Sequence, residues 1–250
     1  MYKCSTEAER EFLANYDASK YERPSVTADI VIFTLDEEDE LNILLIRRGG
    51  FPYKDFWAIP GGFLNVGKES IDDAAARELK EETNVDGVFL KQLYTFGDLD
   101  RDPRTTVVSV AYMALVPKQM LDIKAGDDAQ DARLFKIKYE VDGLLFVNGK
   151  TKIREKDLAF DHAKIIKMAI PRLRNRIDYE DDAFNLLKNK EEFTISELKK
   201  IYETIKNEKL NLPNFRKAFL REYVETGKVI ELDKTTSTRG RSARLYKYIG

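Results

Sequence analysis

One helical stretch constrains this chain more than any other feature, because its apolar face carries acidic side chains. Residues 71–85 follow a glycine-containing loop, Ser70 is a natural N-cap, and Asp73 stands three residues after it. At about 100° per residue, Glu78 and Glu82 fall within or beside the apolar stripe. That stripe, which we expect to pack inward, is formed by Ile71, Ala75 and Leu79. The fold must therefore place this helix against a core while two carboxylates reach the edge of that core.

Glu81 lies close to Glu78 and Glu82 around the same helix, so three carboxylates converge on a partly buried edge. Their repulsion and loss of hydration would cost several kcal/mol unless a positive charge stood among them. Arg77, one turn before Glu81, can offset one charge. The remaining charge is best met by Mg²⁺ or Mn²⁺, which take carboxylate and water ligands and can also bind phosphate. The alternative is a surface helix whose acids pair with lysines, the usual case for an arbitrary E-x-x-E-E pattern.

The same stretch resembles the Nudix signature, G-x5-E-x7-R-E-U-x-E-E-x-G-U. The matching positions are Glu69, Arg77, Glu78, Leu79, Glu81, Glu82 and Val85. The resemblance implies an α+β fold, the Nudix α/β/α sandwich with a mixed sheet, and a metal site for pyrophosphate bonds of nucleoside diphosphates linked to another group. It also implies that Glu78, Glu81 and Glu82 bind the metal, that Arg77 orients them, and that Glu69 is a supporting acid.

Two positions depart from the signature. The loop between Gly62 and Glu69 holds six residues instead of five, and Asn84 stands where the family has glycine. The second change is mild, because a left-handed residue after a helix can be Asn as well as Gly. The first bears on catalysis, since displacing a bound phosphate by about 1 Å can lower a rate on the order of a hundredfold. Nucleotide binding can survive a change that catalysis does not.

The composition predicts a globular, cytoplasmic protein of one or two domains. Of 250 residues, 43% are hydrophobic and 34% are charged, which is enough for a core and unlike a disordered chain. No run of about 18 apolar residues occurs and the N-terminus is too polar for a signal peptide, so membrane spanning and secretion are disfavoured. Cys4 and His162 are the only cysteine and histidine, which excludes a Cys/His metal centre.

The net charge of −2 conceals two parts of opposite sign. Residues 186–250 carry 15 Lys/Arg against 9 Asp/Glu, and residues 1–185 carry the remaining 27 against 35. A basic C-terminal piece behind an acidic body suggests a module for a polyanion. The alternative is a solvated, lysine-rich surface with no such partner.

The first part of the chain reads as alternating strands and helices. Thr27–Leu35 and Leu41–Arg48 should pair as a hairpin around the acidic loop Asp36–Glu40. A second hairpin is expected at Asn148-Gly149, a dipeptide that can adopt positive φ at both turn positions. A second helix is expected over about 161–177, where Pro171 should kink or split it. Further strands are expected at 90–96, 107–116, 132–137, 144–147 and 150–153.

Several segments outside the helix resemble NrtR proteins, which are Nudix-related transcriptional regulators, and this likeness spans nearly the whole chain. They are Tyr21–Thr27, Phe56–Gly62, Phe96–Arg104, Ala125–Asp128 and Ala159–His162. The resemblance implies an effector pocket for ADP-ribose or a related sugar nucleotide, usually in a homodimer.

Chemistry gives the same segments plausible tasks. Arginine guanidinium groups could clamp a pyrophosphate, aromatic rings could stack on adenine, and the glycine loop could present its backbone to phosphate. The candidates are Arg47, Arg48, Arg101 and Arg104, the rings of Phe51, Tyr53 and Phe56, and the glycines Gly61 and Gly62. The alternative for each arginine is a surface ion pair, and for each ring it is core packing. For His162 a capping or packing role is favoured over a catalytic one, because Nudix chemistry needs no imidazole.

The basic tail has the order of a winged helix. Thr194 and Glu197 form a capping box before one helix, a second helix follows Pro213, and two short strands end the chain. A basic helix can enter the major groove of DNA while the loop between the strands reaches phosphates or the minor groove. The candidate DNA-binding residues are Arg216, Lys217, Arg221, Arg239, Arg241 and Arg244. The alternative is a small dimerisation or lid domain; Asn214–Lys217 and Gly240–Tyr246 resemble NrtR tails and favour DNA.

The sequence therefore predicts a Nudix domain over 1–155, a connecting helix over 156–185 and a winged-helix domain over 186–250. The predicted function is a transcriptional regulator that responds to ADP-ribose or a similar nucleotide sugar and binds double-stranded DNA as a homodimer. The rival prediction is an active Mg²⁺-dependent hydrolase that converts ADP-ribose to AMP and ribose 5-phosphate.

Overall fold

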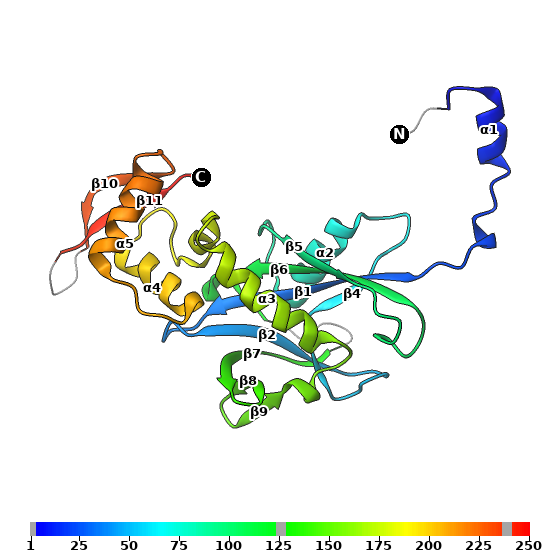
Figure 1. Cartoon of the computed structure of the whole chain (residues 1–250), viewed down its shortest axis with the longest axis horizontal. Helices are drawn as coiled ribbons and strands as arrows, with labels where there is room; N and C mark the ends of the chain where they lie inside the picture. The colour runs from blue at the N-terminus through cyan, green and yellow to red at the C-terminus, as the bar shows by residue number, and fades with distance from the viewer. Residues whose placement is uncertain (1–3, 124–128, 237–241) are drawn as a thin grey trace.

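The computed structural model describes residues 4–123, 129–236 and 242–250 (Figure 1). Its centre is a mixed sheet with the strand order β5-β6-β1-β2-β7-β8-β9, to which β3 is added beside β2 and β4 beside β1. β1 and β6 are parallel, and the other neighbouring strands are antiparallel. The strands are β1 (Ser25–Leu35), β2 (Leu41–Arg48), β3 (Trp57–Ala58), β4 (Gly61–Phe63), β5 (Lys91–Phe96), β6 (Val107–Leu115), β7 (Ala129–Glu140), β8 (Gly143–Asn148) and β9 (Thr151–Arg154).

β1 is buried along most of its length, and its alternate residues enter two separate cores. Val31 and Phe33 join one hydrophobic cluster, whereas Ile30 and Ile32 join the other. Because successive side chains of a strand point to opposite faces, the sheet must be covered on both sides.

Two helices provide this cover. On one face, α2 (Ile71–Thr83) buries Ala74, Ala75 and Leu79 in the cluster that contains Ile30. On the other face lies α3 (His162–Arg176), whose buried residues Ile165, Ile166, Ala169, Ile170 and Leu173 belong to the cluster that contains Phe33. The predicted α/β/α sandwich with a mixed sheet is confirmed.

Capping chemistry sets both ends of α2. The Ser70 hydroxyl accepts a hydrogen bond from the Asp73 N–H at 3.2 Å, and the Asp73 carboxylate accepts the Ser70 N–H at 3.1 Å. Asn84 ends the helix in the left-handed conformation with a φ of 54°. The predicted capping box and the predicted left-handed Asn84 are both confirmed, so the acidic positions along α2 lie where the 3.6-residue period places them.

Two local features differ from the prediction. Pro171 lies inside α3, which continues as a single helix, so the alternative of a split helix is wrong. Pro171 is exposed while Ile170 and Leu173 beside it are buried, and packing of that inner face keeps the two halves joined. The β8–β9 hairpin forms as predicted, with a positive φ at Gly149 (55°) but not at Asn148. A helix that we did not predict, α1 (Glu7–Ala14), has no buried residue.

The C-terminal elements form the predicted helix, helix and hairpin. They are α4 (Ile195–Lys206), α5 (Leu212–Phe219) with a π-helical turn over Leu220–Val224, β10 (Val229–Thr235) and β11 (Arg244–Tyr248). Their core is aromatic: Phe193, Phe219 and Tyr246 are each 1% exposed. The same hydrophobic cluster includes Leu173 of α3, so the winged helix is joined to the body by continuous apolar packing.

No helix in the described ranges has the length and apolar character needed to cross a membrane. The domain limits at residues 155 and 185 stay predictions.

The exposed proline of α3 generates a stability prediction. Relative to alanine, a proline inside a helix lowers the stability of the folded protein by about 3 kcal/mol. Proline also makes the unfolded chain stiffer, which raises the stability of the folded protein by only about 0.4–1 kcal/mol. We therefore expect Pro171→Ala to raise the free energy of unfolding by roughly 2–2.6 kcal/mol in urea denaturation. Pro213→Ala is the matched control, because Pro213 stands in the first turn of α5, where a missing N–H costs nothing. A Pro171→Ala protein no more stable than the control would contradict this account of α3.

Candidate functional site

Arg77 ties the acidic end of α2 to the preceding loop. Its Nε and Nη2 donate to the two carboxylate oxygens of Glu69 at 3.1 and 3.0 Å, and Nη2 also donates to the Phe63 carbonyl at 3.1 Å. Its Nη1 donates to Glu78 Oε1 at 2.6 Å and to Glu81 Oε2 at 3.2 Å. One guanidinium therefore binds three carboxylates from two segments and offsets one of their charges.

The longer loop still delivers Glu69 to Arg77. Asn65 donates both its backbone N–H and its side-chain amide to Glu69 Oε1 at 2.9 Å. The loop turns back through a Lys68 N–H to Asn65 carbonyl bond of 3.0 Å, with Gly67 at a φ of 76°. A residue with a side chain would be strained at that φ, so glycine suits the position.

The acids of the site differ in how readily they ionise. The hydrogen bonds from Arg77 lower the pKa of Glu69 to about 2, so Glu69 is ionised at neutral pH. Burial raises the pKa of Glu78, and this effect exceeds the opposing attraction of Arg77. Glu78 and Glu82 are each 8% exposed, whereas Glu81 is exposed. This agrees with the predicted position of Glu78 and Glu82 within the apolar stripe.

Two glycines allow the strands to approach these acids. A Cβ atom on Gly62 would overlap the Glu78 carboxylate, and one on Gly61 would overlap Asp29 and the Ala28 carbonyl. Gly61 and Gly62 belong to β4, which pairs with β1 at Asp29 and Ala28. Only glycine at both positions lets β4 pass this close to the acidic end of α2.

These residues open onto a cavity of about 790 Å³. Most of the predicted site residues line it, namely Arg48, Gly61, Gly62, Arg77, Glu78, Glu81, Glu82, Arg101 and Arg104. It is also lined by Thr27, Asp29, Ile46, Ile59, Phe63, Asp102, Val107, Phe160 and His162. The cavity thus places arginines opposite carboxylates across one polar space.

Arg101 is held inside the protein. Its side chain is 4% exposed and donates to both carboxylate oxygens of Asp161 at 2.8 and 3.2 Å and to Asp29 Oδ2 at 3.3 Å. Asp29 also accepts the hydroxyl of Ser109. The guanidinium thus joins β1, the loop after β5 and the start of α3, and its fork is directed at protein carboxylates.

Arg48 and Arg104 both lie near a ring that we did not select from the sequence, Phe160. The Cζ atom of Arg48 is 4.9 Å from the centre of the Phe160 ring, and that of Arg104 is 5.8 Å from it. Phe160 has a φ of 52°, which is uncommon for a bulky residue. Arg104 forms a two-point ion pair with Asp102 at 2.8 and 3.0 Å and keeps 43% of its side chain exposed.

His162 is a buried acceptor. The Ile59 backbone N–H donates to its Nδ1 at 3.1 Å, so this nitrogen carries no proton. Burial lowers the pKa of His162, which favours the neutral ring. The packing role favoured from the sequence agrees with this geometry.

Four predicted ligand contacts lie outside the lining of the cavity: Arg47, Phe51, Tyr53 and Phe56. Arg47 pairs with Asp55 at 3.1 Å, Phe51 is 83% exposed, and Phe56 is 40% exposed. Tyr53 packs on Phe160 with ring centres 4.7 Å apart, and Phe56 packs edge-on against Tyr53. These aromatics form a layer behind Phe160, while Arg47 and Phe51 remain predictions without a contact to the cavity.

Comparison with known proteins places this architecture in a family. Residues 24–144 match the NUDIX domain model, and residues 183–248 match the NrtR DNA-binding winged helix domain model. The chain is 33% identical over 244 residues to the ADPR responsive transcriptional repressor NtrR of Acinetobacter baylyi, covering 96% of this chain and 88% of the relative. The chain belongs to the NrtR family of Nudix-related transcriptional regulators.

Two further relatives bear on the two halves of this NrtR-family protein. The crystal structure of Shewanella oneidensis NrtR complexed with a 27mer DNA matches with a TM-score of 0.68 and 28% identity, covering 90% of this chain and 93% of that one. The ADP-ribose pyrophosphatase of Methanocaldococcus jannaschii is 35% identical over 161 residues, which is 63% of this chain and 82% of the relative.

The winged helix of the NrtR-family chain presents a basic face. Phe219 and Tyr223 point into the core. Three basic residues near them in the chain are exposed, namely Arg216, Lys217 and Arg221. Arg244 on β11 is 53% exposed at its side chain and pairs with Glu231. Arg239 and Arg241 lie outside the described residues. The exposed cations of α5 are therefore available to an anionic partner.

Sequence reasoning missed Asp29, Asp161 and Phe160, and two of the three had a signal. Asp29 is a lone charged residue in the otherwise apolar run of β1, which indicates a buried partner. Asp161 stands at the start of the helix expected over about 161–177, where an acidic residue is favoured. Phe160 had no signal beyond its segment, because its left-handed φ is visible only in the structure.

The buried histidine generates a pH prediction. Its folded pKa lies below the unfolded value of about 6.5, so the unfolded chain binds a proton that the folded chain does not. The resulting stability is complete above that unfolded pKa and is lost as the pH falls, by up to about 1.4 kcal/mol per pH unit. We expect His162→Asn to flatten the dependence of the urea unfolding free energy between pH 7 and pH 5. The same slope in both proteins would contradict the neutral, buried assignment.

Proposed function

We propose that this protein is a transcriptional regulator whose Nudix domain binds ADP-ribose and whose winged helix binds operator DNA. The observation that carries the proposal is the cavity of about 790 Å³, which combines the α2 acids with four arginines in a chain that also carries a basic winged helix. The name of the Acinetobacter relative, with 33% identity over 96% of this chain, supports ADP-ribose as the effector.

Arg48 and Arg104 are the proposed contacts for the diphosphate. Guanidinium forks match phosphate oxygens in two-point geometry, and these two groups lie near the Phe160 ring at the cavity wall. Arg101 has a different proposed role, because its donors face Asp29 and Asp161. It positions the wall of the pocket and does not itself grip the ligand.

Glu78, Glu81 and Glu82 are the proposed holders of Mg²⁺ or Mn²⁺. Carboxylate oxygen is the donor that these hard cations prefer. Burial raises the pKa of Glu78, and a nearby positive charge lowers that pKa and favours the ionised form. When bound, the metal would supply charge neutralisation for a diphosphate and activation of water. Arg77 and Glu69 hold the acids in place whether or not hydrolysis follows.

On DNA, the proposed contact is the exposed face of α5, placed in the major groove as in other winged helices. Arg216, Lys217 and Arg221 supply its charge. We further propose a cytoplasmic homodimer, whose two-fold symmetry calls for a palindromic operator. Effector binding weakens the operator complex because the pocket favours one of two arrangements of the paired winged helices.

The regulator proposal predicts salt-dependent DNA binding that ADP-ribose weakens. A palindrome should be selected from a randomised DNA library, and its dissociation constant measured by fluorescence anisotropy at two salt concentrations. Lys217→Ala should weaken binding and lower the slope against the logarithm of salt by about one, because one phosphate contact is lost.

Lys152→Ala on β9 is the control, since it removes the same charge from the other domain. ADP-ribose should raise the dissociation constant of the wild-type complex, whereas NAD, pentoses and sugar phosphates should not. Binding that is indifferent to salt, or to ADP-ribose, would overturn the regulator proposal.

Hydrolysis is the second candidate function, and one observation favours it. Glu69 reaches Arg77 with two hydrogen bonds despite the six-residue loop, and the same guanidinium also contacts Glu78 and Glu81. If the site is catalytic, we expect the protein to release AMP from ADP-ribose in the presence of Mg²⁺. The turnover number should be about 1 s⁻¹ or higher, within the usual range for enzymes. Glu82→Gln should abolish this release, and Glu225→Gln, an exposed acid of the other domain, should not. AMP release that Glu82→Gln leaves unchanged would remove the metal assignment.

A further inference from the structure

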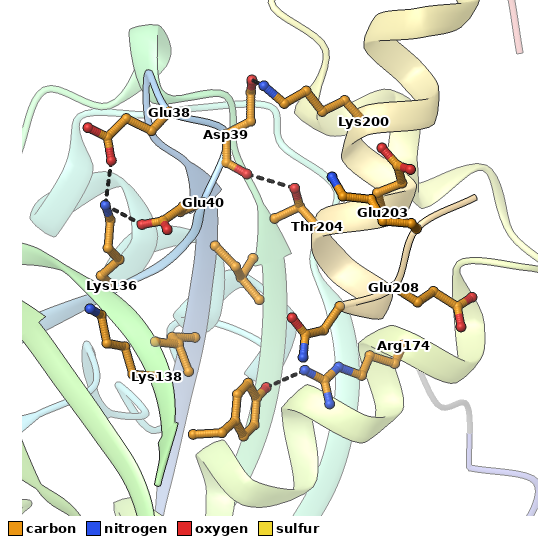
Figure 2. Close-up of a pocket in the computed structure, with 15 residues that line it drawn as sticks. Glu38, Asp39, Glu40, Lys136, Lys138, Arg174, Lys200, Glu203, Thr204 and Glu208 are labelled. Carbon is orange, nitrogen blue, oxygen red and sulfur yellow. Dashed lines mark hydrogen bonds and ion pairs between the residues drawn. The ribbon is translucent and has the colours of Figure 1, made fainter. Parts of the chain in front are cut away.

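A second cavity lies where the Nudix body meets the winged helix. It has a volume of about 430 Å³ and is bounded by the tip of the β1–β2 hairpin, β7, α3 and α4 (Figure 2). The polar contacts across it are few and specific, and they come from two elements of the body. Both elements also reach the nucleotide cavity at their other end.

The first element is the hairpin, which contacts α4 through one residue. The Asp39 carbonyl accepts the Thr204 hydroxyl at 2.7 Å, and the Asp39 carboxylate pairs with Lys200 (Figure 2). Lys200 and Thr204 are four residues apart and so lie on one face of α4. Asp39 has a φ of 58°, a left-handed conformation that Asp and Asn adopt more readily than most other residues. The carbonyl and the carboxylate of Asp39, at the tip of the hairpin, therefore both face α4.

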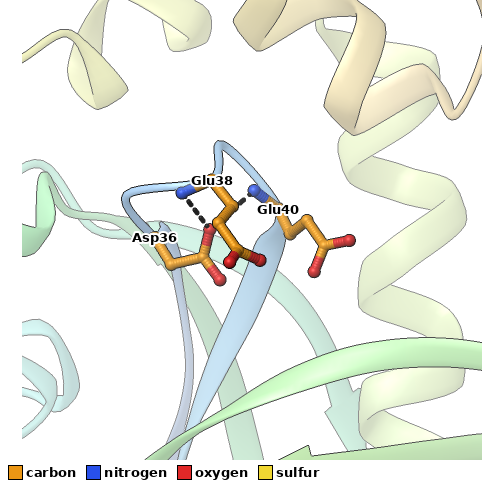
Figure 3. Close-up of side chains that lie close together, drawn as sticks. All are labelled: Asp36, Glu38 and Glu40. Atoms are coloured by element: carbon orange, nitrogen blue, oxygen red, sulfur yellow. Dashed lines mark hydrogen bonds between the residues drawn. The ribbon is translucent and has the colours of Figure 1, made fainter.

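The tip is built as a stiff support. The Asp36 carboxylate accepts the backbone N–H groups of Glu38 and Glu40 at 3.0 and 2.9 Å (Figure 3). Asn42 adds a hydrogen bond of 3.1 Å to the same carboxylate. The close acids of the tip already have a counterion, because Lys136 pairs with all three. This acidic group is therefore a braced turn and carries no cation site of its own.

The second element is α3, which contacts the last turn of α4. The Arg174 Nε donates to the Ile205 carbonyl at 3.0 Å, a group that the end of the helix leaves without an intrahelical partner. Arg174 Nη2 donates to the Tyr139 hydroxyl of β7 at 2.6 Å. The guanidinium therefore joins α3, β7 and α4 at a single point.

The far ends of the same two elements form the nucleotide cavity. Thr27 and Asp29 of β1 and Arg48 of β2 line it, and α3 begins at His162, which also lines it. Arg101 fixes β1 to the residue just before α3, through Asp29 and Asp161. A ligand that moves Arg48, or the ion pairs of Arg101 with Asp29 and Asp161, thus acts on both the β1–β2 hairpin and α3. Both of these elements contact α4.

We propose that Asp39 and Arg174 form a two-point coupling device that transmits occupancy of the nucleotide cavity to the winged helix within one chain. This inference rests on the proposed regulator function and names how that regulation is carried. The buried Leu198 and Ile201 of α4 share a hydrophobic cluster with α3 and act as the pivot. The polar contacts of Asp39 and Arg174 with α4 set its angle, because hydrogen bonds can exchange partners without exposing apolar surface.

The test compares DNA affinity with and without ADP-ribose in a double variant, Thr204→Val with Arg174→Gln. The measured quantity is the ratio of the two dissociation constants for the selected palindrome, typically about 5–150-fold in coupled systems. We expect the double variant to lower this ratio at least fivefold, while calorimetry shows the ADP-ribose affinity of the free protein within about twofold of wild type.

Matched controls separate coupling from a general loss of structure. Thr226→Val removes a hydroxyl that bonds inside the winged helix, to the Glu222 carbonyl at 2.7 Å, and Arg172→Gln removes an exposed charge of α3. Both should keep the wild-type ratio. Thr204→Ser keeps the hydroxyl and should restore the contribution that Thr204→Val removes.

The outcomes distinguish the two levels of proposal. A wild-type ratio of one overturns both the regulator function and the coupling device. A wild-type ratio well above one that the double variant retains overturns the device and leaves the regulator function intact. An equal fall in the control variants also overturns it, because the effect would not depend on the contacts of Asp39 and Arg174.

Discussion

The ion pairs of the Arg77 guanidinium are the interactions on which the rest of the site depends. Without it, the loop acid Glu69 and the helix acids Glu78 and Glu81 would stand close together with their charges uncompensated, at a cost of several kcal/mol. With it, α2 can bury its apolar face against the sheet while its acidic edge stays at the cavity. The same guanidinium holds the Phe63 carbonyl, so the loop after β4 is fixed to the helix that follows it.

A second arginine organises the opposite wall in a different way. Arg101 is buried between Asp29 and Asp161, and this ion-pair network ties the central strand to the start of α3. Removing either partner from such a network leaves a buried charge uncompensated, which is strongly destabilising. The network therefore joins the pocket wall to the start of α3, the helix whose Arg174 contacts α4.

The sequence analysis predicted the features that depend on neighbouring residues and missed the contacts between residues far apart in the chain. The capping box, the inward period of α2 and its buried acids depend on residues within one or two turns, so propensity and spacing suffice. The partners of Arg101 lie 60 and 72 residues away, and His162 accepts from a residue 103 positions away. No period encodes such pairs. Arg101 was consequently predicted as a pyrophosphate clamp, although its donors face two protein carboxylates.

The charge pattern of the site explains how one scaffold can bind a nucleotide with or without turning it over. Arg77 offsets part of the charge of Glu69, Glu78 and Glu81, and the remaining negative charge favours a bound cation. A divalent ion must compete with the Arg77 guanidinium for Glu78 and Glu81, and a diphosphate must compete with Asp102 for Arg104. In the proposed function, the metal and the diphosphate thus use separate sets of side chains of one cavity. Selection for regulation can preserve the arginine side, and with it the connection through β1, β2 and α3 to α4, independently of metal affinity on the acidic side.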